Sequence, residues 1–212
     1  MKKVFIYLIG LIAIIPSELK SRTLQNSNME TKESVSKIAV FAGGCFWCTE
    51  AIFYQLKGVQ KVVSGYSGGK VAHPTYEQVC TGMTGHAECT QITYDPQQVT
   101  FEDLLEVFWM THDPTTLNRQ GADSGTQYRS AIFYTDEDQK QVAIAYKAKL
   151  EKEKIWSNPI VTEITKFEKF YPAEDYHQKY YESNPNQSYC RIVITPKIEK
   201  FKKIFADKLK TK

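Results

Sequence analysis

An apolar run, Ile38 to Ala42, followed at once by Gly43-Gly44 and a pair of cysteines, constrains the fold of this chain more than any other segment. The run predicts a buried strand, and the two glycines predict a turn. The residues from Cys45 to about Leu56 then predict a helix. A folded part that begins with strand, tight turn and helix is expected to pack helices against a sheet.

Extended and helical patterns continue to alternate along the rest of the chain. A capping box at Thr100 to Asp103 opens one helix, and Thr135 is expected to cap the next. This alternation favours an α+β fold, a two-layer α/β sandwich with helices on a mixed or antiparallel sheet. A doubly wound sheet is less well supported, because Gly43-Gly44 has no spaced third glycine. We expect strands near residues 59–66, 87–94, 130–134, 160–164 and 190–195, and helices near residues 100–111, 135–154, 175–182 and 198–209.

The N-terminal part of the 212-residue chain differs in composition from the remainder. Lys2 and Lys3 precede a short apolar stretch, so residues 1–17 are interpreted as a signal peptide or N-terminal anchor and the protein as exported to the periplasm or cell surface. The polar residues 18–36 predict a flexible linker, and residues 37–212 predict one catalytic domain with a basic C-terminal helix. The net charge of +3 gives no indication of a nucleic-acid partner.

Cys45 and Cys48 stand three residues apart at the predicted helix start. Unpaired N–H groups and the helix dipole favour a thiolate there, so Cys45 is a candidate nucleophile. Side chains at this spacing have Cβ atoms about 5–6 Å apart, so the pair could cycle between dithiol and disulfide after modest rotation. Half of a zinc site and a pair of merely buried cysteines are the alternatives, and no second ligand pair with metal spacing accompanies the first.

Two polar clusters could complete a site. Glu88 follows a glycine-rich stretch that also carries Tyr76, and partial burial beside aromatic rings would raise the pKa of its carboxyl toward that of a proton donor near neutrality. Asp123 and Tyr128 lie in a polar loop that enters a strand, where they could orient groups or donate hydrogen bonds. By composition alone, a solvated glutamate, a turn-forming aspartate and a half-buried tyrosine are the more ordinary interpretations.

Six short motifs occur together in the order found in one enzyme family. They are Gly44-Cys45-Phe46-Trp47, Thr84-Gly85-His86-Ala87-Glu88, Tyr94-Asp95-Pro96, His112-Asp113-Pro114, Gly125-Thr126-Gln127-Tyr128-Arg129-Ser130 and Tyr189-Cys190. With them the chain, from about Lys37 to Phe201, resembles the A-type peptide methionine sulfoxide reductases. The resemblance implies a ferredoxin-like two-layer α/β sandwich with a long C-terminal coil segment. It also implies the reduction of methionine (S)-sulfoxide, free or in proteins, which repairs oxidative damage.

The resemblance also implies roles for individual residues. The Cys45 thiolate would attack the sulfoxide sulfur and become a sulfenic acid, and Glu88 would give a proton to the sulfoxide oxygen. The remaining roles fall to polar and aromatic neighbours: Tyr76 and Tyr128 would hydrogen-bond the sulfoxide oxygen, Asp123 would fix water or the substrate backbone, and Phe46 and Trp47 would enclose the substrate methyl. No metal and no bound cofactor are implied.

A resolving thiol must then attack the sulfenic acid. Cys48, one helical turn away, is favoured by proximity, and Cys190 is the alternative because it matches members that resolve from the C-terminal coil. Either would pass its disulfide to a thioredoxin-like dithiol, the expected electron donor. Cys80 and Cys89 are interpreted as structural. We expect a monomer, with membrane contact only through an uncleaved N-terminus; a general thiol-disulfide oxidoreductase, a zinc-binding module and a cysteine hydrolase are the competing interpretations.

Overall fold

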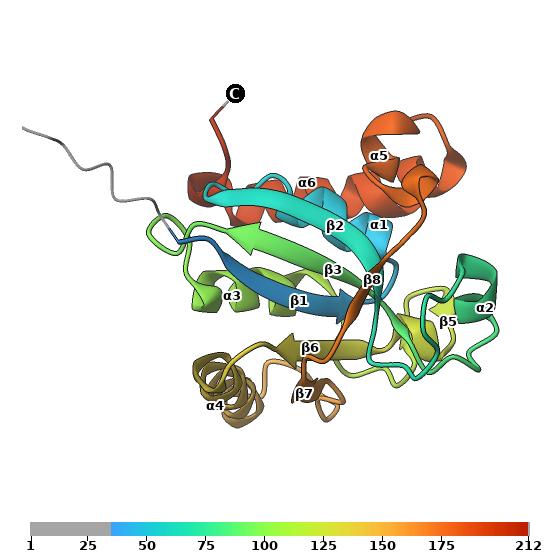
Figure 1. Ribbon diagram of the computed structural model, residues 1–212. Helices are drawn as coiled ribbons and strands as arrows, with labels where there is room; N and C mark the ends of the chain where they lie inside the picture. Colours follow the sequence, from blue (N-terminus) through green and yellow to red (C-terminus); the bar gives the residue numbers. More distant parts are fainter. Residues whose placement is uncertain (1–34, 212) are drawn as a thin grey trace, which may run out of the picture. The chain divides into compact units, whose positions relative to one another are not determined.

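The computed structural model describes residues 35–211. The expected signal peptide or anchor, residues 1–17, and nearly all of the expected linker, residues 18–36, therefore lie outside the described residues. Within residues 35–211, no helix is both long and apolar enough to cross a membrane. The first strand begins at Lys37 (Figure 1), directly after the segment interpreted as a linker.

A curved six-stranded sheet lies at the centre of the fold, with the strand order β7-β6-β1-β3-β2-β8 (Figure 1). Neighbouring strands run antiparallel, apart from the parallel pair β6 and β7. The strands are β1 (Lys37–Gly43), β2 (Val59–Ser67), β3 (Ala87–Tyr94), β6 (Ser130–Tyr134), β7 (Glu163–Lys166) and β8 (Phe170–Pro172), and a separate hairpin is formed by β4 (Arg119–Gln120) and β5 (Asp123–Ser124).

Helices α1 to α4 lie in the connections between strands of the sheet. Helix α1 joins β1 to β2, and α3 leads from β3 towards β6. The α-helices are α1 (Phe46–Phe53), α2 (Tyr76–Cys80), α3 (Phe101–Thr111), α4 (Glu137–Glu153), α5 (Tyr180–Ser183) and α6 (Thr195–Ile204). Short 3₁₀ turns occupy Thr126–Tyr128, Asp175–His177 and Ala206–Lys208, and a π-helical turn occupies Cys190–Ile194.

Both faces of β1 are buried, which explains its uninterrupted apolar sequence. Ala39 and Phe41 point to the helical side, where the Phe41 ring lies 5.0 Å from that of Phe108 on α3. Val40 and Ala42 point to the other side, where the chain around β8 covers them with aromatic rings, Phe167 and Phe170. Alternate residues of a strand face opposite sides, so covering both sides removes the usual polar alternation.

The elements with strong local signals are confirmed. Strands β2, β3 and β6 match the predicted extended segments to within one residue. The capping box of α3 is present: Thr100 Oγ1 accepts from the Asp103 N–H at 3.1 Å, and Asp103 Oδ2 accepts from the Thr100 N–H at 2.9 Å. At α4 the prediction is one residue off, because Asp136 rather than Thr135 caps the helix through the Gln139 N–H.

The predicted strand at residues 190–195 is wrong. These residues form the π-helical turn that leads into α6, and the Thr195 hydroxyl donates to the Cys190 carbonyl at 3.0 Å. Pro196 stands in the first turn of α6, where its fixed φ is preorganised for a helix. The burial of Cys190 and Ile194, four residues apart, follows a helical rather than an extended period. The sequence also gave no sign of α2 or of the β4–β5 hairpin, which lie inside predicted loops.

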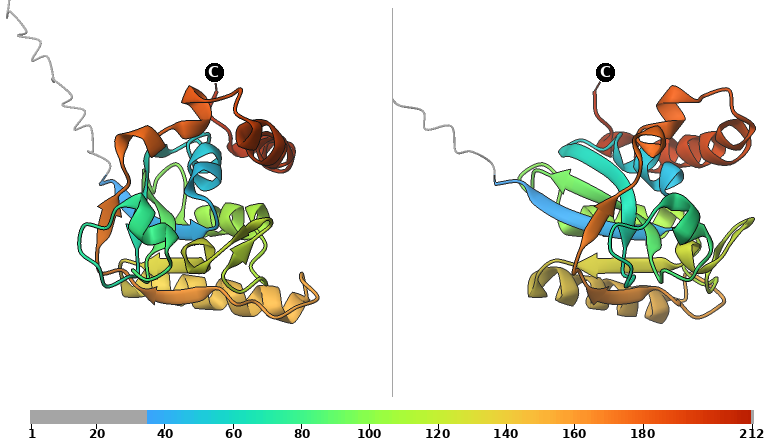
Figure 2. Two further views of the ribbon diagram at one scale, coloured as in Figure 1. Left: turned by 90° about the vertical axis from the view of Figure 1, so that its right-hand side faces the viewer. Right: turned by 45° about the vertical axis from the view of Figure 1, so that its right-hand side comes forward.

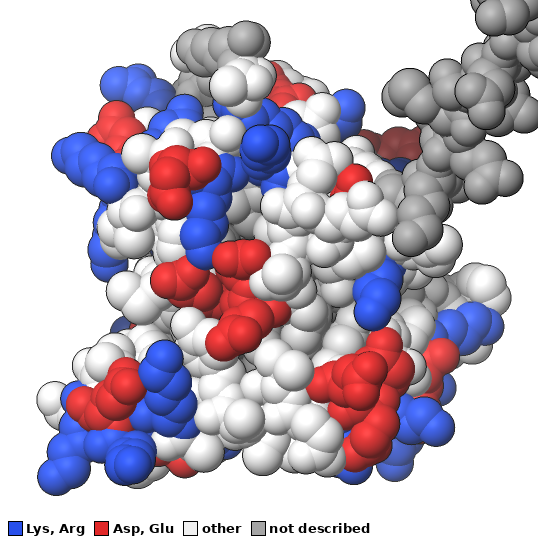
Figure 3. All heavy atoms as spheres, turned by 90° about the vertical axis from the view of Figure 1, so that its left-hand side faces the viewer, with Lys and Arg blue, Asp and Glu red and all other residues white. Residues whose placement is uncertain are grey.

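The C-terminal segment crosses the sheet and returns beside α1. Figures 1 and 2 show α6 lying alongside α1. On the surface, acidic and basic side chains lie next to one another on the face drawn in Figure 3. Ion pairs fasten the end of this segment to α3, since Lys208 Nζ lies 2.8 Å from Asp103 and 2.6 Å from Glu106. The segment that follows β8 is thereby held against the helical side of the sheet.

Candidate active site

The turn between β1 and α1 positions Cys45. Gly44 has a φ of 88°, and a Cβ there would come 2.6 Å from the Cβ of Gln120 on the β4–β5 hairpin, so both the backbone and the space require glycine. Cys45 is the N-cap residue of α1, and its carbonyl accepts from the Cys48 N–H at 3.1 Å. The first thiol therefore sits where the sheet, the helix and the hairpin meet.

Glu88 reaches the same helix end from β3. Its Oε2 accepts from the Phe46 N–H at 3.1 Å, and the residue is 2% exposed. Desolvation by burial raises the pKa of the Glu88 carboxyl to about 8, although the Phe46 N–H opposes the shift. The carboxyl is therefore mostly protonated at neutral pH, next to Cys45.

The two thiols of α1 form a coupled pair that does not behave as the helix dipole predicts. Burial raises the pKa of Cys45 well above its ordinary value. A hydrogen bond from Cys45 instead lowers the pKa of Cys48 to about 7, against its own desolvation and with the help of Lys197. Because the Phe46 N–H donates to Glu88, one fewer N–H group at the helix end is free to stabilise a Cys45 thiolate. When the pair loses its first proton, the hydrogen bond between the thiols favours the negative charge on Cys48 rather than on Cys45.

Aromatic side chains from the C-terminal segment form a wall beside the thiols. The Trp47 ring stacks on that of Tyr180 with centroids 3.7 Å apart and planes at 7°. Its Nε1–H donates to His177 Nδ1 at 3.2 Å, which fixes the orientation of the indole. Phe46 is 1% exposed, and its ring centroid lies 5.0 Å from that of His177. The structure thus brings Phe46 and Trp47 together as an apolar surface next to Cys45.

Asp123 is connected to the site by a hydrogen bond from Tyr189. The Tyr189 hydroxyl donates to Asp123 Oδ2 at 2.6 Å, and the Tyr189 ring meets Trp47 edge-on at 5.9 Å. Burial raises the pKa of Tyr189, and the charges of Cys45 and Cys48 raise it further. The phenol therefore keeps its proton and is held by Asp123 beside both sulfurs.

Tyr76 and Tyr128 are half-buried and lie near enough to Glu88 to feel its charge. Desolvation raises the pKa of both phenols, and the charge of Glu88 adds to each shift. Both therefore remain hydrogen-bond donors over the physiological range. The Tyr76 ring lies 4.4 Å from that of His177, so it also adjoins the aromatic wall.

The other cysteines have unequal surroundings. Cys190 is fully buried. Burial raises the pKa of the Cys190 thiol, and the charge of Cys48 raises it further. Cys89 is fully buried on the opposite face of the sheet, in the cluster around Val40. Cys80, interpreted as structural from the sequence, is exposed at the end of α2 near Tyr76.

Three contributors were missed or given no role by sequence reasoning: His177, Tyr180 and Tyr189. They belong to a stretch after β8 that is dense in tyrosine, which was the available signal. Their contacts with Trp47 span 130 residues or more of sequence, so no local pattern could indicate them.

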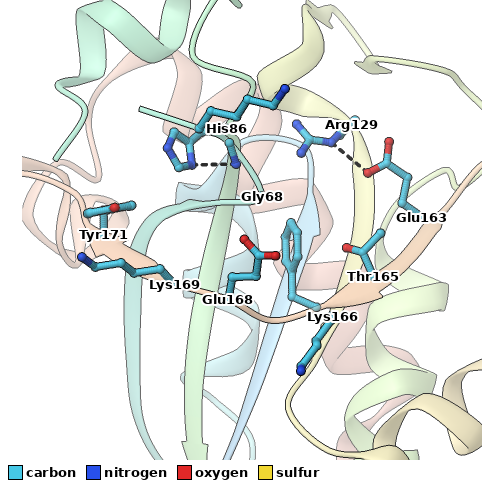
Figure 4. Close-up of a pocket in the computed structure, with 12 residues that line it drawn as sticks. Gly68, His86, Arg129, Glu163, Thr165, Lys166, Glu168, Lys169 and Tyr171 are labelled. Atoms are coloured by element: carbon cyan, nitrogen blue, oxygen red, sulfur yellow. Dashed lines mark hydrogen bonds and ion pairs between the residues drawn. The ribbon is translucent and has the colours of Figure 1, made fainter. Parts of the chain in front are cut away.

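A separate cavity of about 660 Å³ lies on the other face of the sheet (Figure 4). Its rim carries the ion pair between Arg129 and Glu163 at 3.1 Å, and His86 Nδ1 accepts from the Gly69 N–H. None of the thiols or aromatic residues around α1 lines it, so we do not assign the reaction to it. Across residues 35–211 no group of three or more His, Cys, Asp or Glu residues could hold a metal ion.

A protonated carboxyl beside a thiol pair is the arrangement that thiol-dependent reduction of a polar bond to oxygen needs, and it makes this chain a cysteine-dependent oxidoreductase. The family model "Peptide methionine sulfoxide reductase" matches residues 37–209. The chain belongs to this family.

Individual relatives agree with that assignment. The peptide methionine sulfoxide reductase MsrA of Deinococcus radiodurans is 52% identical over 191 residues, which cover 90% of this chain and 93% of that protein. MsrA 1 of Rhodopirellula baltica is 56% identical over 174 residues, or 82% of this chain and 90% of that protein.

Two solved structures share the mixed α/β fold with its curled sheet. Reduced Mxr1 from Saccharomyces cerevisiae is 34% identical with a TM-score of 0.67, covering 73% of this chain and 89% of that chain. The methionine sulfoxide reductase A of Corynebacterium diphtheriae is 36% identical with a TM-score of 0.65, covering 72% and 76%.

Proposed function

We propose that this chain reduces methionine (S)-sulfoxide, free and in proteins, to methionine, and so repairs oxidised proteins. The observation that carries the proposal is the protonated carboxyl of Glu88 at the helix end that bears Cys45. A sulfoxide is a poor electrophile until its oxygen is protonated, so acid and nucleophile must converge on one S–O bond.

In the first step, the Cys45 sulfur attacks the sulfoxide sulfur while Glu88 gives its proton to the sulfoxide oxygen. A sulfur–sulfur bond to Cys45 forms as the S–O bond of the substrate breaks and the protonated oxygen departs as hydroxide. The hydroxide then attacks the Cys45 sulfur, the sulfur–sulfur bond breaks, methionine leaves, and Cys45 becomes a sulfenic acid. Tyr76 and Tyr128 supply hydrogen bonds to the oxygen, and Asp123 orients the site through Tyr189. The thiol proton of Cys45 passes to Cys48 as the sulfur attacks, because the two thiols share a hydrogen bond, and Cys48 loses it to solvent before the resolving step.

The substrate methyl would rest against the aromatic wall. Phe46 and Trp47 form an apolar surface whose orientation is fixed by His177 and Tyr180. With the methyl there and the oxygen toward Glu88, one epimer presents its sulfur to Cys45 and the other does not. The resemblance to the A-type peptide methionine sulfoxide reductases implies that the accepted epimer is S, and the purified chain is expected to turn it over. Reduction of the R epimer alone would contradict the proposal.

Cys48 is the proposed resolving thiol. It lies one helical turn from Cys45 and has a pKa of about 7, whereas burial raises the pKa of the alternative, Cys190. Enzyme given substrate without reductant should show a Cys45–Cys48 disulfide by peptide mapping. Cys48→Ala should still release about one methionine per Cys45 in a single turnover, which a general thiol-disulfide oxidoreductase would not do. Cys190→Ala is the matched control and should still form the Cys45–Cys48 disulfide. A dominant Cys45–Cys190 bridge in the wild-type enzyme would contradict the assignment.

We also propose a thioredoxin-like dithiol as the reductant, because the disulfide left on the enzyme is returned to two thiols by thiol-disulfide exchange. The protein is proposed to be an exported monomer. The basic and apolar composition of residues 1–17 supports export, and the mass of the mature chain in expressing cells tests whether that segment is removed.

The core is proposed to be a ferredoxin-like two-layer sandwich. Its support is the pair of strand-helix-strand units, β1-α1-β2 and β3-α3-β6, whose four strands lie in the order β6-β1-β3-β2. The long segment after β8, made of short helical turns and connecting coil, is the part added to that core.

A further inference from the structure

A lysine side chain lies against the second thiol of α1. The Lys197 ammonium nitrogen is 3.8 Å from Cys48 Sγ, and Cys48 is 2% exposed. Within residues 35–211 no carboxylate lies within ion-pair distance of this ammonium, although other lysines, such as Lys140 and Lys208, have such partners. A half-buried cation whose nearest polar partner is a thiol favours the ionised form of that thiol.

The fold holds Lys197 in this position. It is the third residue of α6, and the π-helical turn Cys190–Ile194 sets the register in which the helix begins. The next turn is anchored by Ile198 and Phe201, which are 3% and 1% exposed in the core beside α1. Lys197 also lines a cavity of about 350 Å³ next to His112.

The remaining groups that act on Cys48 supply no second positive charge. Cys45 donates a hydrogen bond to it, the Tyr189 hydroxyl donates to Asp123, and Glu88 is mostly protonated near neutrality. His112 is neutral, because burial lowers its pKa to about 4. The groups facing Cys48 from the surrounding elements are Cys45, Glu88, Asp123, Tyr189, Cys190 and Lys197. Lys197 is the cation among them.

We propose that Lys197 is a catalytic residue of the resolving step, where its ammonium group holds Cys48 as the thiolate that attacks the Cys45 sulfenic acid. The inference rests on the proposed function, in which Cys48 resolves. The Cys48 sulfur attacks the Cys45 sulfur, the S–S bond forms, and the S–O bond of the sulfenic acid breaks. The departing hydroxide takes one proton from solvent and leaves as water, so the sulfenic acid is reduced as Cys48 is oxidised.

The first test measures the ionisation of Cys48. Thiolate absorbance near 240 nm is titrated in Cys45→Ser protein, whose hydroxyl can still donate to Cys48, with Cys45→Ser/Cys48→Ala as the blank. Adding Lys197→Met should raise the midpoint by about 1 to 2 pH units, the scale of a lost opposite charge at this distance. Adding Lys197→Arg should leave the midpoint near its original value, because the charge is kept. Equal midpoints for the Lys, Met and Arg forms would overturn the proposal.

The second test follows the resolving step in otherwise wild-type protein. Lys197→Met should still release about one methionine per Cys45 in the first turnover, but its sulfenic acid, trapped with dimedone, should live about three- to tenfold longer at pH 7. The effect is smaller than the loss of thiolate, because a more basic thiolate is also a better nucleophile. Raising the pH to 9 should remove the difference, which a merely structural defect would not do. An unchanged lifetime, or an Arg variant as slow as Met, would contradict the proposal.

The Cys48→Ala variant shows whether a negative result concerns Lys197 alone or the proposed function as a whole. If Cys48→Ala forms a Cys45–Cys190 disulfide at the wild-type rate, Cys48 is not the resolving thiol, and the role of Lys197 falls with it. If Cys48→Ala accumulates sulfenic acid while Lys197→Met does not, the resolving assignment stands and only the lysine is wrong. If no variant releases methionine in its first turnover, the sulfoxide reductase proposal itself fails.

Discussion

Cys45→Ser should abolish the release of methionine, in single as well as multiple turnovers. A serine hydroxyl at this position ionises far less readily than a thiol and cannot carry the oxygen away as a sulfenic acid. Loss of an essential nucleophile should lower the rate by about 10⁴-fold or more. The measurement is methionine formed per enzyme from the S epimer, with and without reductant.

Cys80→Ser is the matched control for that substitution. Cys80 is exposed at the end of α2, and a serine there can keep the hydrogen bond to Tyr76. It should retain most of the wild-type rate. Appreciable first-turnover methionine from Cys45→Ser would show that another thiol attacks the sulfoxide.

Glu88→Gln should lower the rate of first-turnover methionine release by about 10²- to 10⁴-fold, the usual contribution of a positioned proton donor. Glutamine keeps the shape and can still accept from the Phe46 N–H, so the helix end should be preserved. What it loses is the proton that turns the sulfoxide oxygen into a leaving group. Rapid-quench measurement of methionine isolates this step from recycling.

The same step should depend on pH in a defined direction. The pKa of Glu88 is raised to about 8, so its donor form is present below that value and is lost as the pH rises through it. The first-turnover rate should therefore fall between about pH 7 and 9. Glu88→Gln should show no such fall, and a wild-type rate that climbs through this range would contradict the role of Glu88.

Glu50→Gln is the control for that profile. Glu50 is also buried, and desolvation raises its pKa to about 7, but its Oε1 accepts from the Lys179 N–H at the start of α5. A normal rate and an unchanged fall above pH 7 are expected. The comparison separates the loss of any buried carboxyl from the loss of the one beside Cys45.

Local patterns were enough to predict the elements that carry Cys45 and Glu88. Alternation and runs of apolar residues located β2, β3 and β6, and the capping box located α3. Their meeting depends on the pairing of β1 with β3, in which Phe41 lies opposite Thr90. That register is a long-range property, so the closeness of Glu88 to Cys45 came from the family resemblance and not from spacing.

Two expectations failed because a competing effect was larger. The helix dipole was expected to ionise Cys45, but desolvation of a residue only 7% exposed is the larger effect. The β-branched residues near Ile192 predicted a strand, but Pro196 and the burial of Ile194 begin a helix instead. Lys197, carried on that helix, therefore could not be placed beside Cys48 from the sequence.

The stacking of Trp47 on Tyr180 joins two parts of the site that come from different segments of the chain. The acid and the nucleophile belong to the central sheet and the helix that follows its first strand, whereas His177, Tyr180 and Tyr189 come from the segment after β8. Changes at His177 or Tyr180 can alter which oxidised side chains and peptides are accepted while Cys45 and Glu88 stay as they are. Substrate preference and chemical competence can therefore diverge independently within this one domain.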